Sequence, residues 1–576
     1  MRPKPFTRIL KPGTYARMLP SLLKKQKGNS LMNRKVTLLC TAAACMGLAA
    51  CGNGGGSNAE AGTAEGGKTI TIAKENDVVS LNSILAIDQK SFDVIGMFTE
   101  GLMTLDADNN IIPAIAESYE LSDDQLTYTF KLRDAKWSNG EAVKAQDFVF
   151  AWNELAHNDE AEYSYLVTDD GACIKNGNEI VYDGKDDLDL GVTAKDDKTL
   201  VVELDKKSPQ FLSLMVFPSF YPINEEFYKE KGDQYGLAVE NLLANGPYKV
   251  VEWTKGNSVK VAKNADYWDA GNVKVDNIIV NAVPDFSTSA LDFENGNTDW
   301  TQLNSTLIDR YKDNEAFKEE PESCLWYLQY NYDNKDLANK NLRKAISTVV
   351  DRKDLVENVL KDGSTVLTGF VPAGFTTGPD GKDYRETADS PEALAGDDAV
   401  KAAQEYLDKA LKELGKDEVT LTLLCDSSDP AKPVAEYIQA CTSKLKGLNI
   451  ELLPQEKANR LAKMKDHDFD IVLTGWIPDF SDPTAFLGLM TEGNAYNYGS
   501  YVSEAYDAKL AEAADAATPE ERWTLLQEAE EILLDDEAVS GIYQMGGAVL
   551  QNPKVTGIDH HVFGVSNLYK NADVAE

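Results

Sequence analysis

The sequence is poor in the residues on which most enzymes and metal sites depend. Its 576 residues include only four histidines, and its seven cysteines form no Cys-x-x-Cys pair and no histidine-spaced zinc pattern. It also lacks a glycine-rich phosphate loop, a His-Glu-x-x-His helix and a Gly-x-Ser-x-Gly elbow. We therefore predict no catalytic residue, no metal site, no cofactor and no enzymatic activity. We expect the four histidines to lie at the surface: His157, His467, His560 and His561.

Basic residues are also scarce. The chain carries 94 Asp and Glu against 57 Lys and Arg, which gives a net charge of −37. This charge repels phosphate backbones and anionic membrane surfaces, so we expect no nucleic-acid partner. The acids are spread along the chain rather than grouped in blocks, which indicates that they serve solubility. With 43% hydrophobic and 26% charged residues, the composition is that of a globular protein, and the length suits about four domain-sized units or a few large lobes.

Long apolar runs are nearly absent, and the one close to the N-terminus has a specific form. Val36 to Ala50 is too short to span a bilayer and follows basic residues, which is the pattern of a secretory signal. The run closes with Leu48-Ala49-Ala50-Cys51, which resembles the lipobox of bacterial lipoproteins of a Gram-positive-like type, in which the cysteine is acylated. We therefore expect a signal peptide over 1–51, with Met32 as an alternative start, a lipid on Cys51 and a flexible linker over 52–67.

Four cysteines remain after the signal and the lipid site: Cys173, Cys324, Cys425 and Cys441. Cys425 and Cys441 are 16 residues apart in an expected strand–loop–helix unit. Two interpretations of this pair stay open, a disulfide or two free buried thiols.

Apolar periodicity predicts the elements of the folded body. Residues 68–73 alternate as a half-buried strand, and the spacing from Leu81 to Leu105 is helical. Residues 126–132 alternate as a second strand, which an Asn-Gly turn and a helix beginning near Asp147 follow.

The later chain alternates strands and helices. The spacing predicts a helix over 391–415 that stops at Gly415, strands over 419–424 and 449–453 with a helix over 431–445 between them, and a helix that Thr518 caps. This alternation predicts an α/β lobe with a largely parallel sheet. We expect the segment from Gly541 onward to form strands.

The loop from Gly475 to Thr484 places two carboxylates beside aromatic side chains. An acid next to a tryptophan suits a cationic group on an otherwise uncharged ligand. The same acids, Asp479 and Asp482, are also common turn residues that cap backbone amides before a helix near Pro483. From the local sequence both interpretations stay open.

Several motifs occur in a fixed order along the chain. They are Ile112-Pro113-Ala114-Ile115-Ala116-Glu117, Lys136-Trp137-Ser138-Asn139-Gly140, Asn245-Gly246-Pro247-Tyr248, Asn264-Ala265-Asp266-Tyr267-Trp268, Phe293-Glu294-Asn295-Gly296 and Leu342-Arg343-Lys344-Ala345-Ile346. With these motifs the chain resembles the peptide-binding family of extracellular solute-binding proteins, which serve oligopeptide and dipeptide ABC importers. The resemblance covers the chain from Lys68 to the C-terminus.

The resemblance implies an α/β, two-lobed periplasmic-binding-protein-like fold with an extra domain and a two-strand hinge. It implies lobe I over 68–98, 219–323 and 546–576, the extra domain over 99–218, and lobe II over 324–545. The implied ligand is an extended oligopeptide held between the lobes, with main-chain hydrogen bonds as in an added strand.

The resemblance also implies the ligand-binding residues. The family's aspartate that binds the peptide's α-ammonium corresponds to Asp479, with Gly475 and Trp476 in the same pocket and Gln89 along its wall. Asp482 then keeps the capping role. The chain departs from the family on the strand before Gly475, where a basic residue often meets the ligand's carboxylate but residues 472–474 are Val, Leu and Thr.

The function implied is capture of oligopeptides outside the cell and delivery to an ABC transporter permease, by a monomer held on the outer face of the cell membrane through Cys51. Two alternatives stay open. The same fold could bind a sugar, a metal chelate or haem, or the protein could be a signalling or adhesion lipoprotein without a transport role.

Overall fold

Two large β-sheets organise the residues that the computed structural model describes, which are 67–75, 77–320, 322–388, 390, 394–428 and 430–575. These residues belong to one unit of the chain, which begins at Ala64. The expected signal peptide, the lipid site Cys51 and all of the expected linker except Gly67 lie outside the described residues.

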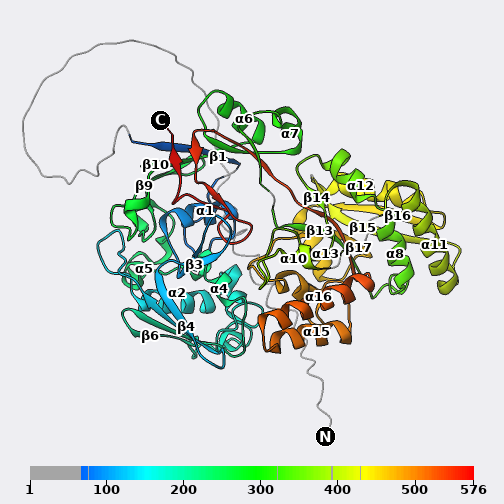
Figure 1. Ribbon diagram of the computed structural model, residues 1–576, viewed down its shortest axis with the longest axis horizontal. Coiled ribbons are helices and arrows are strands. Elements are labelled where there is room, and N and C mark those ends of the chain that lie inside the picture. The colour runs from blue at the N-terminus through cyan, green and yellow to red at the C-terminus, as the bar shows by residue number, and fades with distance from the viewer. Residues whose placement is uncertain are drawn as a thin grey trace, which may run out of the picture. The chain divides into compact units, whose positions relative to one another are not determined.

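The first sheet defines lobe I and draws its strands from both ends of the chain. Its order is β12 (Phe317–Glu319), β19 (Ala548–Gln551), β11 (Trp300–Leu303), β1 (Thr69–Glu75), β10 (Asn277–Val283), β9 (Ser258–Lys263) and β8 (Tyr248–Thr254). β1 runs parallel to β10 and β11, and its Ile70 and Ile72 are fully buried, as the alternation predicts. In Figure 1 the blue β1 accordingly lies with the green β9 and β10.

The second sheet defines lobe II. Its order is β14 (Thr365–Val366), β18 (Val539–Gln544), β13 (Leu325–Tyr330), β17 (Ile471–Trp476), β15 (Val419–Asp426) and β16 (Leu448–Gln455). The prediction of a largely parallel sheet is wrong, because only β15 is parallel to its neighbours, β16 and β17, while the other pairs are antiparallel. The chain enters lobe II through β13 and leaves it through β18. These antiparallel strands therefore do not belong to a strand–helix–strand unit.

The chain crosses between the two sheets twice, which confirms the two-lobed periplasmic-binding-protein-like fold. It leaves β12 for β13 and returns from β18 to β19. The two crossings are hydrogen-bonded to each other, from Glu320 N to Gly547 O at 2.9 Å and from Met545 N to Cys324 O at 2.8 Å. The return of the last strands to the first lobe is thus confirmed for β19.

A small four-stranded antiparallel sheet follows β1 and α1 in the chain. Its order is β4 (Ala116–Leu121), β5 (Thr127–Leu132), β7 (Thr199–Glu203) and β6 (Val192–Asp196), and α2 (Ala145–His157) packs on β6 and β7. Asp147 lies in the first turn of α2 as predicted. Its carboxylate accepts hydrogen bonds from the Lys144 backbone N–H at 3.0 Å and from the Trp137 indole at 2.9 Å.

The helices confirm most of the predicted ends, with one clear correction. The first helix, α1 (Gln89–Phe98), is much shorter than the predicted span from Leu81 to Leu105. It begins where Asp88 accepts a hydrogen bond from Ser91 N, and it ends before Glu100, whose buried carboxylate binds the side chains of Tyr267 and Trp268. A cap and a tertiary contact therefore set its length.

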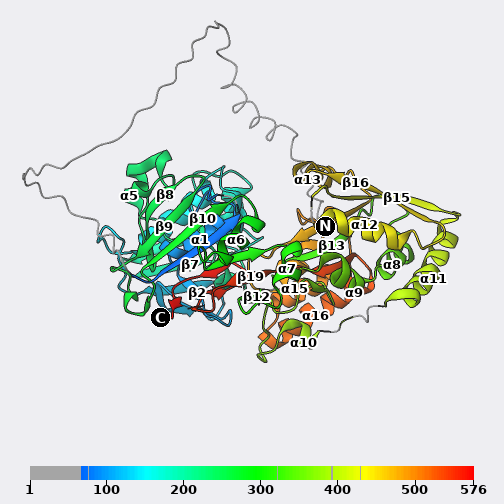
Figure 2. The same cartoon turned by 90° about the horizontal axis from the view of Figure 1, so that it is seen from above.

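Later helix signals are confirmed. α11 (Gly396–Leu414) ends at Gly415, which adopts the left-handed conformation, and Thr518 caps α16 (Pro519–Asp535) through a hydrogen bond from Glu521 N. α12 (Ala431–Thr442) packs on β15 and β16, and α8 (Lys340–Thr348) on α11. Figure 2 shows α8, α11 and α12 grouped beside β15 and β16.

The other α-helices and β-strands complete the described fold. They are α3 (Gly177–Val181), α4 (Phe211–Leu214), α5 (Glu225–Lys231), α6 (Phe286–Glu294), α7 (Ser305–Tyr311), α9 (Arg352–Asp354), α10 (Tyr384–Thr387), α13 (Lys457–Lys465), α14 (Thr484–Leu487), α15 (Glu504–Asp515), β2 (Met103–Leu105), β3 (Ile111–Pro113), β20 (Val555–Thr556), β21 (Asp559–His560), β22 (Asn567–Leu568) and β23 (Asp573–Val574). In the described part of the chain, no helix has both the length and the apolar character needed to cross a bilayer.

Most of the motif residues serve the scaffold. The Asn245 side chain donates to Glu100 O and accepts from Glu100 N, and the Asn264 side chain donates to Gly246 O. The buried guanidinium of Arg343 donates to three backbone carbonyls, two of which lie just after α16. These side chains satisfy backbone groups at turns, which is why their spacing is so recognisable.

The histidine prediction is wrong for His561. This residue is buried, and its Nδ1 lies 2.9 Å from the side-chain oxygen of Asn109. Burial, together with the neighbouring His560, lowers the pKa of His561 to about 4, so the ring is neutral. Cys173, Cys324, Cys425 and Cys441 are all free and buried, which decides the open question about Cys425 and Cys441 in favour of free thiols.

Candidate functional site

Near its end, β17 has a position that requires glycine. Gly475 pairs with Trp326 of β13, and a Cβ atom at Gly475 would lie 2.9 Å from the Trp326 ring. The strand therefore keeps its register only without a side chain there. The next residue, Trp476, is half-buried, and its ring packs edge-to-face on Tyr496 with 4.6 Å between the centroids.

Asp479 lies among tyrosine side chains. Its Oδ2 accepts a hydrogen bond of 2.5 Å from the Tyr165 hydroxyl, which belongs to the 3₁₀ helix Glu162–Val167. Desolvation raises the pKa of Asp479 to about 6, and the hydrogen bond from Tyr165 opposes part of this rise. Among the described residues, no ion pair is formed by this carboxylate, so a cationic group of a ligand would meet an unneutralised acid.

The tyrosines around Asp479 remain protonated donors. Burial, followed by the charge of Asp479, raises the pKa values of Tyr163, Tyr165 and Tyr496. Tyr163 links this group to α1, because its ring contacts that of Phe92 at 5.6 Å and that of Tyr165 at 6.2 Å. The surroundings of Asp479 thus combine side chains from lobe II and from the segment between β5 and β6.

Gln89 lies one turn before Phe92, at the start of α1. Its exposed side chain donates to Asp93 Oδ1 at 3.3 Å and to Gly564 O at 3.1 Å. No hydrogen bond among the described residues joins Gln89 to the loop after β17. The structure therefore brings Trp476, Asp479 and the tyrosines together, while the role of Gln89 stays a prediction.

The second acid of the loop has a different environment. Asp482 is buried, and it accepts hydrogen bonds from the backbone N–H and the hydroxyl of Thr484, at 3.0 and 2.6 Å. It also forms a bidentate ion pair with Arg522 of α16, with both distances 2.8 Å. Burial alone would raise the pKa of Asp482, but the Arg522 charge and the hydrogen bonds outweigh burial and lower it. The capping interpretation is thus confirmed for Asp482.

The structure also supplies a cation at the strand where the sequence shows none. Arg460 of α13 is buried, with its Nη1 3.0 Å from Thr474 Oγ1 and its Nε 2.7 Å from Asp426 Oδ1. Pairing between β15 and β17 ends at Leu424 and Val472, so the guanidinium lies where the two strands separate. The sequence analysis missed Arg460 because this residue lies on α13, a separate helix before β17, and only the fold brings it to Thr474. It also missed Tyr165, although Tyr163-Ser164-Tyr165 was a visible aromatic signal.

Within the described ranges, no group of three or more His, Cys, Asp or Glu is arranged to hold a metal ion.

Comparison with known proteins gives consistent matches over most of the chain. The dipeptide-binding protein DppE of Bacillus subtilis is 31% identical over 512 residues, which cover 87% of this chain and 91% of the relative. The peptide-bound OppA of Listeria monocytogenes is 34% identical, with a TM-score of 0.71, over 89% of this chain and all of the other. The periplasmic murein tripeptide-binding protein MppA, in an unliganded open form, is 26% identical, with a TM-score of 0.75, over 88% and 98% of the two chains.

A family model matches the chain as well. Residues 110–498 match the middle region of the bacterial extracellular solute-binding proteins of family 5. This chain belongs to the family of bacterial extracellular solute-binding proteins, family 5.

Proposed function

We propose that this protein is a lipid-anchored extracellular receptor that captures oligopeptides between its lobes and delivers them to the permease of an ABC importer, without catalysing a reaction. The observation that carries this proposal is the Asp479 carboxylate, which has a tyrosine hydroxyl on one oxygen and no cation of the described chain to neutralise it. A peptide's α-ammonium supplies that cation. The names of the relatives agree with a peptide ligand.

The geometry of β17 supports an extended ligand. β13 pairs with β17 along its whole length, but β15 pairs only with Ile471 and Val472. On that side, residues 473–476 have no strand partner in the described chain, which suits the addition of a peptide as a further strand. Main-chain bonding of this kind gives affinity with little dependence on side chains.

The test compares peptides with and without a free α-ammonium. Purified protein is first incubated with a protein digest and examined by native mass spectrometry, and a retained peptide is then measured by calorimetry beside its N-acetylated form. We expect the N-acetylated peptide to bind at least about tenfold more weakly, because a charge-assisted hydrogen bond contributes roughly 1.5–3 kcal/mol. The Asp479→Asn variant should lose this discrimination, while Asp468→Asn, at an exposed acid of lobe II, should keep it.

The outcomes separate peptide import from the alternatives. Equal affinities for the free and acetylated peptides would contradict the role of Asp479. A single retained non-peptide mass would favour a receptor for a sugar, a metal chelate or haem, and a protein that retains nothing would favour a signalling or adhesion lipoprotein.

The proposal also includes the lipid anchor and the division of the chain into two lobes and an extra domain. Cys51 would carry the lipid, 52–67 the linker, and the monomer would remain on the outer face of the membrane. The strand orders agree with lobe I over 68–98, 219–323 and 546–576, an extra domain over 99–218 and lobe II over 324–545. Membrane fractionation of cells that make the Cys51→Ala variant tests the anchor, because the released protein should appear in the medium.

A further inference from the structure

The sheet of lobe II divides between β15 and β17. The pairing of these two parallel strands ends at Leu424 and Val472. Both strands continue beyond that point, because β15 stays paired with β16 as far as Asp426, and β17 stays paired with β13 as far as Trp476. The two strands therefore separate while each is still held by its other neighbour.

A buried arginine joins the two strands just beyond the point of separation. If the parallel register continued for two more residues, Asp426 would lie opposite Thr474, on the same face of the sheet as Leu424 and Val472. The strands do not pair there. Instead, Arg460 of α13 connects the two side chains, with its Nε 2.7 Å from Asp426 Oδ1 and its Nη1 3.0 Å from Thr474 Oγ1. Asp426, Thr474 and Arg460 are all buried, and together they form a polar bridge.

The end of the pairing coincides with a change from apolar to polar side chains. Leu424 and Val472 belong to a small buried cluster with Met464 and Phe469. Arg460 lies at the edge of this cluster, because its Nη1 donates to Met464 Sδ at 3.0 Å. A buried guanidinium needs acceptors around it, whereas apolar side chains at the same level would simply continue the cluster. The bridge thus lies where closer packing of the strands would otherwise be favourable.

We propose that Arg460, through Asp426 and Thr474, is a positioning residue that keeps β15 and β17 apart and so leaves residues 473–476 open to a ligand backbone. This inference rests on the proposed function, because an extended peptide would be added to that strand edge. Asp426 compensates the charge of Arg460, so Arg460 acts as a spacer and not as the receptor for the ligand's carboxylate. All three residues belong to lobe II, and the bridge does not depend on the position of lobe I.

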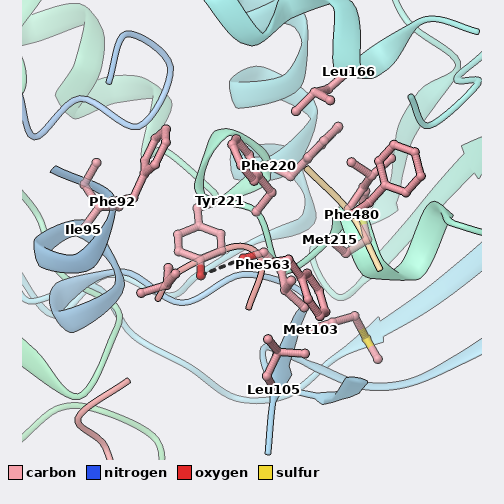
Figure 3. Packing of buried hydrophobic residues seen from close by; sticks show 14 of the residues in the cluster. Phe92, Ile95, Met103, Leu105, Leu166, Met215, Phe220, Tyr221, Phe480 and Phe563 are labelled. Atoms are coloured by element: carbon pink, nitrogen blue, oxygen red, sulfur yellow. Dashed lines mark hydrogen bonds between the residues drawn. The ribbon is translucent and has the colours of Figure 1, made fainter. Parts of the chain in front are cut away.

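The test removes the bridge without leaving a buried charge unpaired. The double variant Asp426→Leu with Arg460→Met replaces the ion pair by apolar side chains of similar size, which buried pairs often tolerate. It also spares the large apolar cluster, part of which Figure 3 shows around Phe92 and Tyr221, because the cluster beside the bridge is a separate one. We expect the strands to pair further, so hydrogen exchange of residues 473–476 in the ligand-free full-length protein should slow by at least about fivefold. A merely weakened fold would speed this exchange.

A second buried ion pair of lobe II supplies the matched control. The side chains of Arg385 and Glu530 are 6% and 2% exposed, and Glu530 also accepts hydrogen bonds from the backbone N–H groups of Phe370 and Val371. The double variant Arg385→Met with Glu530→Gln keeps an acceptor for those groups and should not slow exchange at 473–476. If the bridge variant does not fold, Thr474→Val removes one side of the bridge and should slow the same exchange to a smaller extent.

A peptide retained by the protein gives a second measurement. The bridge variant should bind it at least about tenfold more weakly, because the strand edge is occupied, while the preference for the free over the N-acetylated peptide persists. The C-terminally amidated peptide should bind the unchanged protein as strongly as the free acid does.

Unchanged or faster exchange at 473–476 in a folded bridge variant would overturn the proposal. Slower exchange with unchanged peptide affinity would overturn the link to the ligand. A preference for the free acid that Arg460→Met abolishes would make Arg460 the carboxylate receptor instead of a spacer. If no peptide is retained, the proposed function fails, but the exchange experiment still decides whether the bridge keeps the strands apart.

Discussion

At the scale of single residues, one loop carries two aspartates whose surroundings give them opposite roles. Asp482 has a guanidinium and two donors from Thr484, so its charge is compensated inside the protein. Asp479 has a tyrosine hydroxyl and no cation among the described residues, so desolvation dominates and its pKa rises to about 6. A compensated acid stabilises the structure, whereas an uncompensated one is available for a cationic ligand.

We expect the affinity for peptides with a free ammonium to fall as the pH falls through about 6. On our proposal the ligand's ammonium binds the ionised form of Asp479. Binding should therefore have its full strength between this pKa and the ammonium's own pKa of about 7.7–8.0, and should weaken by about tenfold for each pH unit below the Asp479 pKa. Calorimetry between pH 4.5 and 7 measures the effect. Asp479→Asn should show a flat profile, and an equally steep profile in that variant would mean that another group titrates.

At the scale of elements, the loop depends on a helix far along the chain. β17 delivers the loop, and Arg522 of α16 fixes it through Asp482, while Pro478 and Pro483 restrict its backbone. The position of Asp479 therefore depends on packing between the β17 loop and α16, and not on the loop sequence alone.

We expect Asp482→Ala to lower the free energy of unfolding by roughly 3–5 kcal/mol, because it leaves the buried Arg522 guanidinium without its partner. Chemical denaturation measures this loss. Glu512→Gln, which removes an exposed ion pair of α15, is the matched control and should cause no measurable change. A loss of less than about 1 kcal/mol for Asp482→Ala would show that water replaces the pair.

At the scale of the whole molecule, two sheets and two crossings hold the described chain together, without a disulfide among the described residues. Lobe I joins the first strand, β1, to a strand near the C-terminus, β19, through β11. Such a sheet cannot form until most of the chain has been made. The four cysteines of the described chain are buried thiols in this arrangement.

We expect the thermal unfolding midpoint to be the same with and without a reducing agent. A disulfide between Cys425 and Cys441 would raise the free energy of unfolding by about 3 kcal/mol, so its reduction would lower the Tm. Calorimetry in both conditions tests this expectation. Alkylation after denaturation, without reduction, should modify all four thiols, and protection of two of them would reveal a disulfide.

The sequence by itself determined the features that depend on local pattern. Alternation predicted β1, β5 and β15, and caps predicted the start of α16 and the end of α11. Ordered motifs identified the family and its two-lobed fold, because turns with fixed hydrogen-bonding side chains leave a recognisable spacing. Asp479 could be named from the same resemblance, although its ligand contact stays a proposal.

Only the tertiary structure decided the features that join distant segments. The sheet of lobe II is mixed because its central strands come from the hinge crossings, and α1 is short because Glu100 turns toward Tyr267 and Trp268. Tyr165 reaches Asp479 across 314 positions of the chain, and Arg460 reaches Thr474 from another helix. Local sequence carries no signal for such contacts, because burial and neighbouring charge arise only when the chain has folded.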